Sequence, residues 1–173
     1  MSNVSWSVRA ATEADRGLLR AFRCADPTIS WQVDVENCIQ NRVLDWAQAP
    51  GAAEDDPRVL LVLTQKSSKL IGVAAHERVF MRDEAVTIAA TKLCVVAVAT
   101  KWQGKTLKGD ARASTVVMSA AMQDIASRVP PRHARVLAVV HKENARSLAL
   151  CRRYGFDIKL SDPDPAYIRL VTS

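Results

Sequence analysis

The spacing of apolar and polar positions divides the first quarter of the chain into a strand and two helices. Alternating polarity over residues 4–10 predicts the strand. A capping box between Thr12 and Asp15 then predicts the start of a helix that extends to about residue 24. Apolar residues on one stripe predict a second helix over residues 33–47.

Continuous apolar runs and helix terminators organise the rest of the chain. Three strands are predicted first, and the long third one is expected to carry a bulge or bend. They cover residues 58–65, 70–79 and 85–98. A helix, a strand, a helix that ends at Gly155 and two closing strands follow; they cover residues 109–128, 135–140, 144–154, the vicinity of Ile158 and residues 167–171. This order predicts a mixed α/β fold in which one domain spans residues 1–173, a length that one hydrophobic core can serve.

Composition narrows the class of protein. The chain is 49% hydrophobic and 24% charged, without the run of about 18 apolar residues that crosses a bilayer. Because no signal peptide is recognisable either, we expect a cytoplasmic protein without a membrane partner. The four cysteines lack metal-ligand spacing, so no metal is expected. The net charge of +6 favours an anionic ligand, but no run of five or six basic residues forms a nucleic-acid arm.

A strand that leads into a basic turn is the most informative segment. Residues 96–98 read Val-Ala-Val, and Trp102, Gln103, Gly104 and Lys105 follow within a few positions. A turn between a strand and a helix leaves N–H groups unpaired at the positive end of the helix dipole, which suits a pyrophosphate. Basic residues surround this turn: Lys101, Lys105, Lys108 and Arg112.

A second motif follows after one further strand and begins at Asn144. With Leu148, Gly155 and Phe156 it matches a helix that ends in Gly-Phe. Together the two motifs resemble those of the GNAT family of N-acetyltransferases, in order and spacing, from about residue 8 to residue 156. The resemblance implies a mixed, mostly antiparallel central sheet, flanked by helices, whose central strands 85–98 and 135–140 part at their C-terminal ends.

The resemblance also implies an activity, the transfer of an acetyl (acyl) group from acetyl-CoA to an amine of a small molecule, peptide or protein. The pantetheine arm would pair with the exposed strand, and catalysis would rest mainly on positioning. The residues that the resemblance assigns to binding acetyl-CoA are Val96, Ala97, Val98, Gln103, Gly104, Lys105, Thr106, Leu107, Lys108 and Asn144.

Three positions depart from the family pattern. Thr106 and Lys108 stand where glycine or alanine is usual, and Cys151 stands where a tyrosine often protonates the departing thiolate. Thr106 is either a helix residue of ordinary φ or a sign of a decayed coenzyme site. Cys151 is either the proton donor or a packing residue, and in the second case Tyr154 or water is the donor.

The motifs do not fix a general base or the acceptor. His141 lies three residues before Asn144, close to the expected thioester, whereas His76 and Glu77 face opposite sides of a strand, so only one of them can point at the cleft. The acceptor site of this fold is lined by the first two helices and the loop between them. Four residues there could receive a cationic amine: Asp26, Trp31, Asp34 and Glu36.

Two other functions remain open at this point. The departures at residues 106, 108 and 151 would suit a binding or regulatory protein that keeps the fold without turnover. The net charge would suit an enzyme that acts on aminoacyl-tRNA, and so would five arginines, Arg128, Arg132, Arg135, Arg152 and Arg153. Coenzyme phosphates can account for part of that charge. The sequence also leaves a homodimer open.

Overall fold

Seven strands form a single sheet in the computed structural model, which describes residues 4–46, 55–83, 86–128 and 135–172. The order across the sheet is β1-β2-β3-β4-β5-β7-β6. The strands are β1 (Trp6–Ala10), β2 (Arg58–Thr64), β3 (Leu70–Asp83), β4 (Val86–Val98), β5 (Val136–His141), β6 (Phe156–Ser161) and β7 (Tyr167–Thr172). β4 and β5 run parallel, and the other pairings are antiparallel. The predicted mixed, mostly antiparallel sheet is therefore confirmed.

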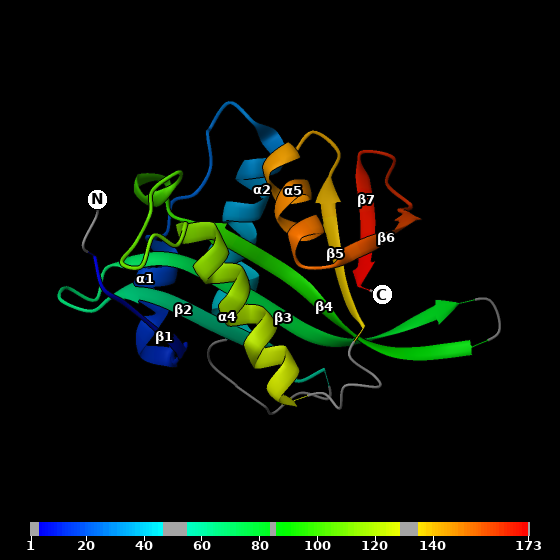
Figure 1. Ribbon diagram of the computed structural model, residues 1–173, viewed down its shortest axis with the longest axis horizontal. Coiled ribbons are helices and arrows are strands. Elements are labelled where there is room, and N and C mark those ends of the chain that lie inside the picture. Colours follow the sequence, from blue (N-terminus) through cyan, green and yellow to red (C-terminus); the bar gives the residue numbers. More distant parts are fainter. Residues whose placement is uncertain (1–3, 47–54, 84–85, 129–134, 173) are drawn as a thin grey trace.

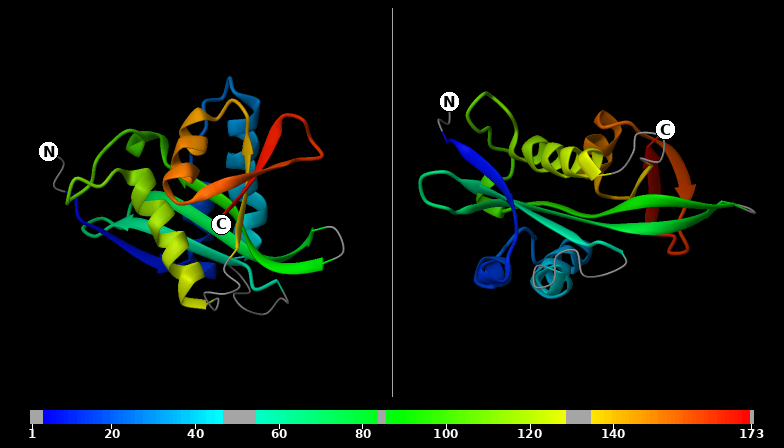
Figure 2. Two further views of the ribbon diagram at one scale, coloured as in Figure 1. Left: turned by 45° about the vertical axis from the view of Figure 1, so that its right-hand side comes forward. Right: turned by 90° about the horizontal axis from the view of Figure 1, so that it is seen from below.

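Helices cover both faces of this sheet. When the sheet is seen edge-on, α4 and α5 lie on one side and α1 and α2 on the other (Figures 1 and 2). The α-helices are α1 (Arg16–Arg20), α2 (Ser30–Cys38), α3 (Leu44–Trp46), α4 (Ala113–Arg128) and α5 (Ala145–Arg153). Two 3-10 turns, η1 (Glu13–Asp15) and η3 (Thr100–Trp102), and a π-helix, η2 (Ile39–Val43), complete the chain's described helical segments. None of the helices in these described segments is long and apolar enough to cross a membrane.

The central strands are apolar on both faces because the sheet separates two cores. Toward α4 and α5, the core includes Leu93, Val117 and Phe156. Toward α1 and η2, it includes Leu19 and Ile39, with further residues of β2, β3 and β4. Strands buried on both sides read as continuous apolar runs rather than alternating ones, which explains the run in β2.

Several predicted boundaries need correction. The capping box of Thr12 and Asp15 forms, but α1 ends at Arg20 rather than near residue 24. The second helical segment begins at Ser30 and passes through η2 and α3 to Trp46, and its predicted last residue lies outside the described part. α4 begins at Ala113 rather than at residue 109, since the preceding residues fold into a small loop of their own.

The hairpin of β3 and β4 is longer than predicted and extends beyond the rest of the sheet. β3 continues to Asp83 instead of ending at residue 79. Past the pairs His76–Arg58 and Thr91–Val136, the two strands pair only with each other among the described residues. Figures 1 and 2 show them as an arm that leaves the body of the molecule.

Candidate functional site

The two parallel strands at the centre of the sheet separate after three pairs of residues. The pairing of β4 with β5 covers Thr91 with Val136, Lys92 with Leu137 and Leu93 with Ala138, and no further residue. β4 nevertheless continues to Val98 and β5 to His141. The predicted parting of these strands is confirmed, and it leaves an edge of β4 without a strand partner in the described structure. Backbone groups on such an edge can bind an extended ligand as an added strand would.

A β-bulge lies where the strands part. Ala75 pairs with Val95 and His76 with Leu93, so Cys94 is an extra residue in β4, as expected for so long a strand. Bulges redirect side chains and are frequent beside active sites. The Cys94 thiol lies 3.4 Å from a carboxylate oxygen of Glu77. Burial, and to a smaller extent this carboxylate, raise the pKa of Cys94 to about 12.

The turn at residues 103–108 does not offer the row of free N–H groups that the sequence predicts. Four of its N–H groups donate to carbonyl groups of the chain, namely those of Gln103, Lys105, Leu107 and Lys108. Of residues 103–108, only Gly104 and Thr106 keep an N–H group without an acceptor among the described residues, because the bridge between residues 106 and 112 closes a loop before α4. Further N–H groups without intrahelical acceptors belong to the first turn of α4, at Ser114 and Thr115.

The unusual residues of this turn adopt ordinary backbone conformations. Gly104 has a φ of +72°, where glycine is favoured, whereas Thr106 and Lys108 are not at positive φ. Threonine in place of glycine at residue 106 thus creates no backbone strain. Leu107 is 1% exposed and belongs to the core, so its side chain does not face a ligand.

The side chain of Gln103 has a role that the sequence did not reveal. Its Nε2 donates to the carbonyl oxygens of Cys24, at 2.7 Å, and of Val98, at 3.1 Å. Both the N–H and the hydroxyl of Thr100 also donate to the Arg23 carbonyl, at 2.9 and 3.1 Å. These bonds hold the loop that follows α1 against the end of β4.

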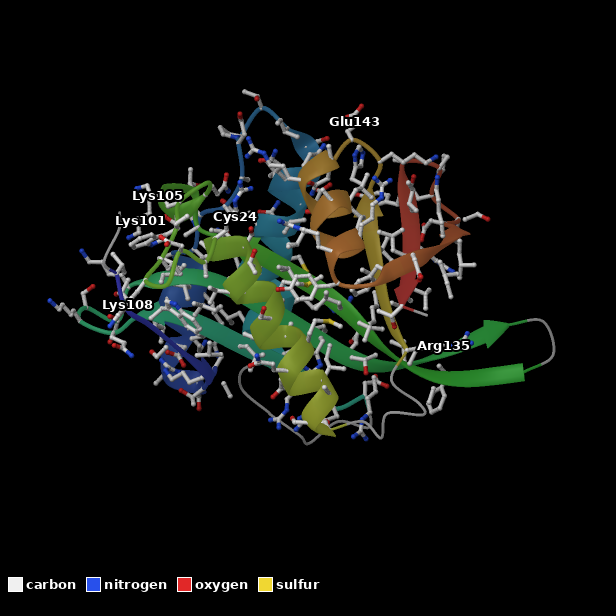
Figure 3. The ribbon with its side chains drawn as sticks, in the orientation of Figure 1. Cys24, Lys101, Lys105, Lys108, Arg135 and Glu143 are labelled. Carbon is white, nitrogen blue, oxygen red and sulfur yellow. The ribbon has the colours of Figure 1, made fainter. Side chains whose placement is uncertain are left out.

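Lysine side chains surround the exposed part of the same turn. The Nζ atoms of Lys101 and Lys105 lie 6.0 and 5.7 Å from the centre of the Trp102 ring. Figure 3 shows these two lysines side by side and Lys108 further along the loop. All three are exposed, and together they create the positive potential that the sequence predicts for an anionic ligand.

On α5, the three residues of interest each have a partner or a buried position within the protein. The Asn144 side chain caps the helix by accepting from the Ser147 N–H at 3.0 Å. Cys151 is 5% exposed in the core, and burial raises its pKa to about 11. The Tyr154 hydroxyl bonds to α4, to the Thr115 carbonyl at 3.0 Å and the Ser119 hydroxyl at 2.5 Å.

The neighbouring residues His76 and Glu77 face opposite sides of the sheet, as predicted from their position on a strand. His76 Nε2 lies 2.8 Å from a carboxylate oxygen of Asp124 on α4, and burial lowers the pKa of His76. Glu77 points to the other face, where Arg42 of η2 contacts it. Only Glu77 therefore faces the side on which α1 and α2 lie.

His141 lies at the end of β5 in a cluster of aromatic rings. It stacks on Trp31, with ring centres 5.4 Å apart, and meets the edge of Tyr167 at 5.1 Å. Its Nδ1 accepts the Glu143 N–H at 3.2 Å, so in the neutral ring the hydrogen resides on Nε2. In this tautomer the basic nitrogen of the ring, Nδ1, is occupied by the Glu143 N–H, so a role as general base requires His141 to lose that bond.

The acidic residues considered for an acceptor differ in their availability. Asp26 accepts the N–H and hydroxyl of Thr28, and Glu36 accepts the N–H groups of Cys24 and Ala25, so both stabilise the loop after α1. Asp34 is exposed on α2. No three histidine, cysteine or acidic residues of the described segments converge on a metal site.

Solved structures share this architecture, whereas the comparisons of sequence find no match. No family model matches the sequence, and no curated protein matches it either. The structure is similar to the PaiA N-acetyltransferase of Thermoplasma acidophilum in complex with coenzyme A, at a TM-score of 0.67 and 13% identity over 98% of this chain and 99% of that one.

Two further solved structures share the arrangement. One is described as an acetyltransferase of the GNAT family from Desulfovibrio desulfuricans, with a TM-score of 0.58 and 16% identity over 96% of both chains. The other is AtaT complexed with acetyl-methionyl-tRNAfMet, with a TM-score of 0.58 and 14% identity over 95% of this chain and 94% of that one. The chain therefore has the fold of the GNAT acetyltransferases.

Proposed function

We propose that the protein transfers an acetyl group from acetyl-CoA to an amine. The observation that carries this proposal is the parting of β4 and β5 after Leu93 and Ala138, next to the bulge at Cys94. It supplies an unpaired strand edge in the middle of the sheet, with helices on either face. Structures of the same fold include one in complex with coenzyme A.

The coenzyme would lie along the unpaired edge of β4 and end at the basic turn. In this proposal the backbone of residues 96–98 pairs with the pantetheine arm. The phosphates lie beside Lys101, Lys105 and Lys108, within reach of Gly104 and the hydroxyl of Thr106. The first turn of α4 adds the free N–H groups of Ser114 and Thr115 to those of Gly104 and Thr106.

The chemical step needs few groups beyond these. The acceptor attacks the thioester carbonyl carbon as a free amine, the C–N bond forms and the C–S bond breaks. The nitrogen releases one proton, and the coenzyme sulfur takes one up. We assign delivery of the proton to the thiol of Cys151, which is buried at α5 and protonated at neutral pH, and the proton that the nitrogen releases restores this thiol. Asn144 contributes by fixing the start of α5, and Tyr154 by holding α5 to α4.

The test has a binding arm and a turnover arm. Calorimetry measures acetyl-CoA binding to the wild type, to Lys105→Ala at the turn and to Lys66→Ala, an exposed lysine between β2 and β3 that controls for net charge. We expect only Lys105→Ala to weaken binding, with an affinity that falls as salt rises. Transfer is measured by the release of free thiol in the presence of a panel of primary amines and by a mass gain of about 42 Da in the acceptor, because an acetyl group replaces one hydrogen. Binding without release would favour the regulatory protein instead.

A second candidate is transfer to the amino group of aminoacyl-tRNA. A protein of the same fold is seen in complex with acetyl-methionyl-tRNAfMet. The exposed basic residues at the turn and on α5 would attract a polyanion. Binding of tRNA that weakens steeply with salt, together with acetylation of an aminoacyl-tRNA, would support this candidate.

A further inference from the structure

A carboxylate is buried on the face of the sheet opposite α4 and α5, the two helices that lie beside the proposed coenzyme site. Glu77 on β3 pairs across the strands with Lys92 and lies 3.4 Å from the thiol of Cys94, the bulged residue. Its side chain is 11% exposed. The carboxylate is therefore close to the point where β4 leaves β5, on the face covered by α2 and η2.

An exposed arginine occupies the open side of this carboxylate. The Nη2 atom of Arg42 lies 3.2 and 3.3 Å from the two carboxylate oxygens of Glu77, and the Arg42 guanidinium lies 4.9 Å from the centre of the Trp46 ring. Arg42 belongs to the π-helix Ile39–Val43. Such helices are rare in proteins, and those that occur are often found at functional sites. The side chain of Arg42 is 58% exposed, so the cation lies largely in solvent while its anion lies inside.

The ion pair matters more to the buried carboxylate of Glu77 than to the exposed guanidinium of Arg42. A solvated guanidinium gains little from an ion pair and is easily exchanged. A buried carboxylate without any cation is costly, because its charge has lost most of its water. Any cation that fits at the position of the guanidinium can thus replace Arg42 at small net cost.

We propose that Glu77 is the binding site for the cationic head of the acceptor, and that Arg42 occupies this site until the acceptor displaces it. The ligand class is a primary alkylammonium or guanidinium on a narrow chain. This inference rests on the proposed acetyl transfer, since the position of Glu77 near the bulge is what brings a bound amine to the thioester. The charged and titratable groups around Glu77 are Arg42, Lys92, Cys38 and Cys94.

Steady-state kinetics with acetyl-CoA and n-propylamine, spermidine or a lysine-containing peptide distinguish acceptor binding from a purely structural ion pair. Glu77→Gln should raise the KM for the amine at least about tenfold, the weight of a charged hydrogen bond, and leave the KM for acetyl-CoA unchanged. Arg42→Ala should lower the KM for the amine. The control is Arg9→Ala, which breaks a similar pair with the buried Asp15 on β1 and η1 and should leave both KM values unchanged. Unchanged amine KM values in Glu77→Gln and Arg42→Ala would overturn the proposal.

A second measurement does not depend on turnover. Propylammonium or methylguanidinium chloride, compared with sodium chloride at equal ionic strength, should raise the Tm of Arg42→Ala more than that of the wild type. The rise should vanish in Arg42→Ala combined with Glu77→Gln. An equal rise in all three proteins would overturn the cation site even if the enzyme is active. If the cation rescue succeeds and no amine is acetylated, the site is retained and the proposed transfer is what fails.

Discussion

Gly72 on β3 is the position at which the smallest side-chain change should have the largest effect on stability. It lies opposite Val98 of β4 and under α4. A Cβ atom there would be 2.4 Å from Cγ2 of Val117 and 2.7 Å from the carbonyl oxygen of Ala97. Gly72→Ala therefore inserts one methyl group where two neighbours already occupy the space.

Neither neighbour can move cheaply. Val117 is fully buried on α4, and a valine in a helix has one strongly preferred rotamer. The second atom belongs to the backbone of β4. Overpacking of a core costs about 1–3 kcal/mol, and a clash that includes backbone should lie near the upper end, at about 3 kcal/mol. For a chain of this length, that corresponds to a fall in Tm of about 6–12 °C.

Gly17→Ala is the matched control. Gly17 lies in α1, is exposed, and has nothing within 4 Å of the position of an added Cβ. Both substitutions restrict the unfolded chain equally, so their difference isolates the effect in the folded state. Alanine also favours the helix, and Gly17→Ala should stabilise the protein by about 0.5–1 kcal/mol.

Thermal melts and urea unfolding of the three proteins provide the measurement. We expect Gly72→Ala to melt well below the wild type and Gly17→Ala to melt slightly above it. If Gly72→Ala melts within about 2 °C of the wild type, less than 1 kcal/mol separates them and the packing argument is refuted. A low Tm in both variants would instead point to a general intolerance of alanine.

Three further predictions concern single side chains. The hydrogen bond from the Arg9 guanidinium lowers the pKa of Asp15 from 3.8 to about 2. The ionised carboxylate therefore stabilises the fold fully above pH 3.8, and this contribution is lost as the pH falls toward 2. In Asp15→Asn the Tm should fall less steeply over this pH range. Tyr154→Phe should cost about 1–2 kcal/mol in urea unfolding, because it removes the hydroxyl that bonds to the Thr115 carbonyl and the Ser119 hydroxyl and leaves the Ser119 hydroxyl without this partner. Cys151→Ala should reduce turnover about 10²–10⁴-fold if the thiol protonates the thiolate, while a folded variant of normal turnover would leave Cys151 a packing role.

The strand pattern was predictable because burial on both faces of a sheet has a direct signature in the sequence. The apolar run of β2 and the long apolar stretch of β4 follow from the two cores that the sheet separates. The parting of β4 and β5 was also expected, but on the resemblance of the motifs around Gln103 and Asn144. The periodicity of apolar residues alone does not predict that these two strands part.

The loop before α4 could not be predicted, because its structure depends on contacts distant in sequence. The N–H of Lys108 donates to the carbonyl of Val4, and residues 106 and 112 form a bridge. These bonds use the amides that local sequence leaves free for a phosphate. The same reason hid the π-helix at η2, whose wide turn brings Arg42 to a carboxylate 35 positions later in the chain.

The bonds of Gln103 join the turn after β4 to the loop after α1. A carboxamide nitrogen carries two hydrogens, and here both are directed at carbonyl oxygens, those of Cys24 and Val98. A rearrangement of the turn on coenzyme binding must carry the loop after α1 with it or break the bond to Cys24. Binding of the coenzyme at the turn and of an acceptor at the loop after α1 would then be coupled through the side chain of Gln103. The affinity for either ligand should therefore depend on whether the other is bound.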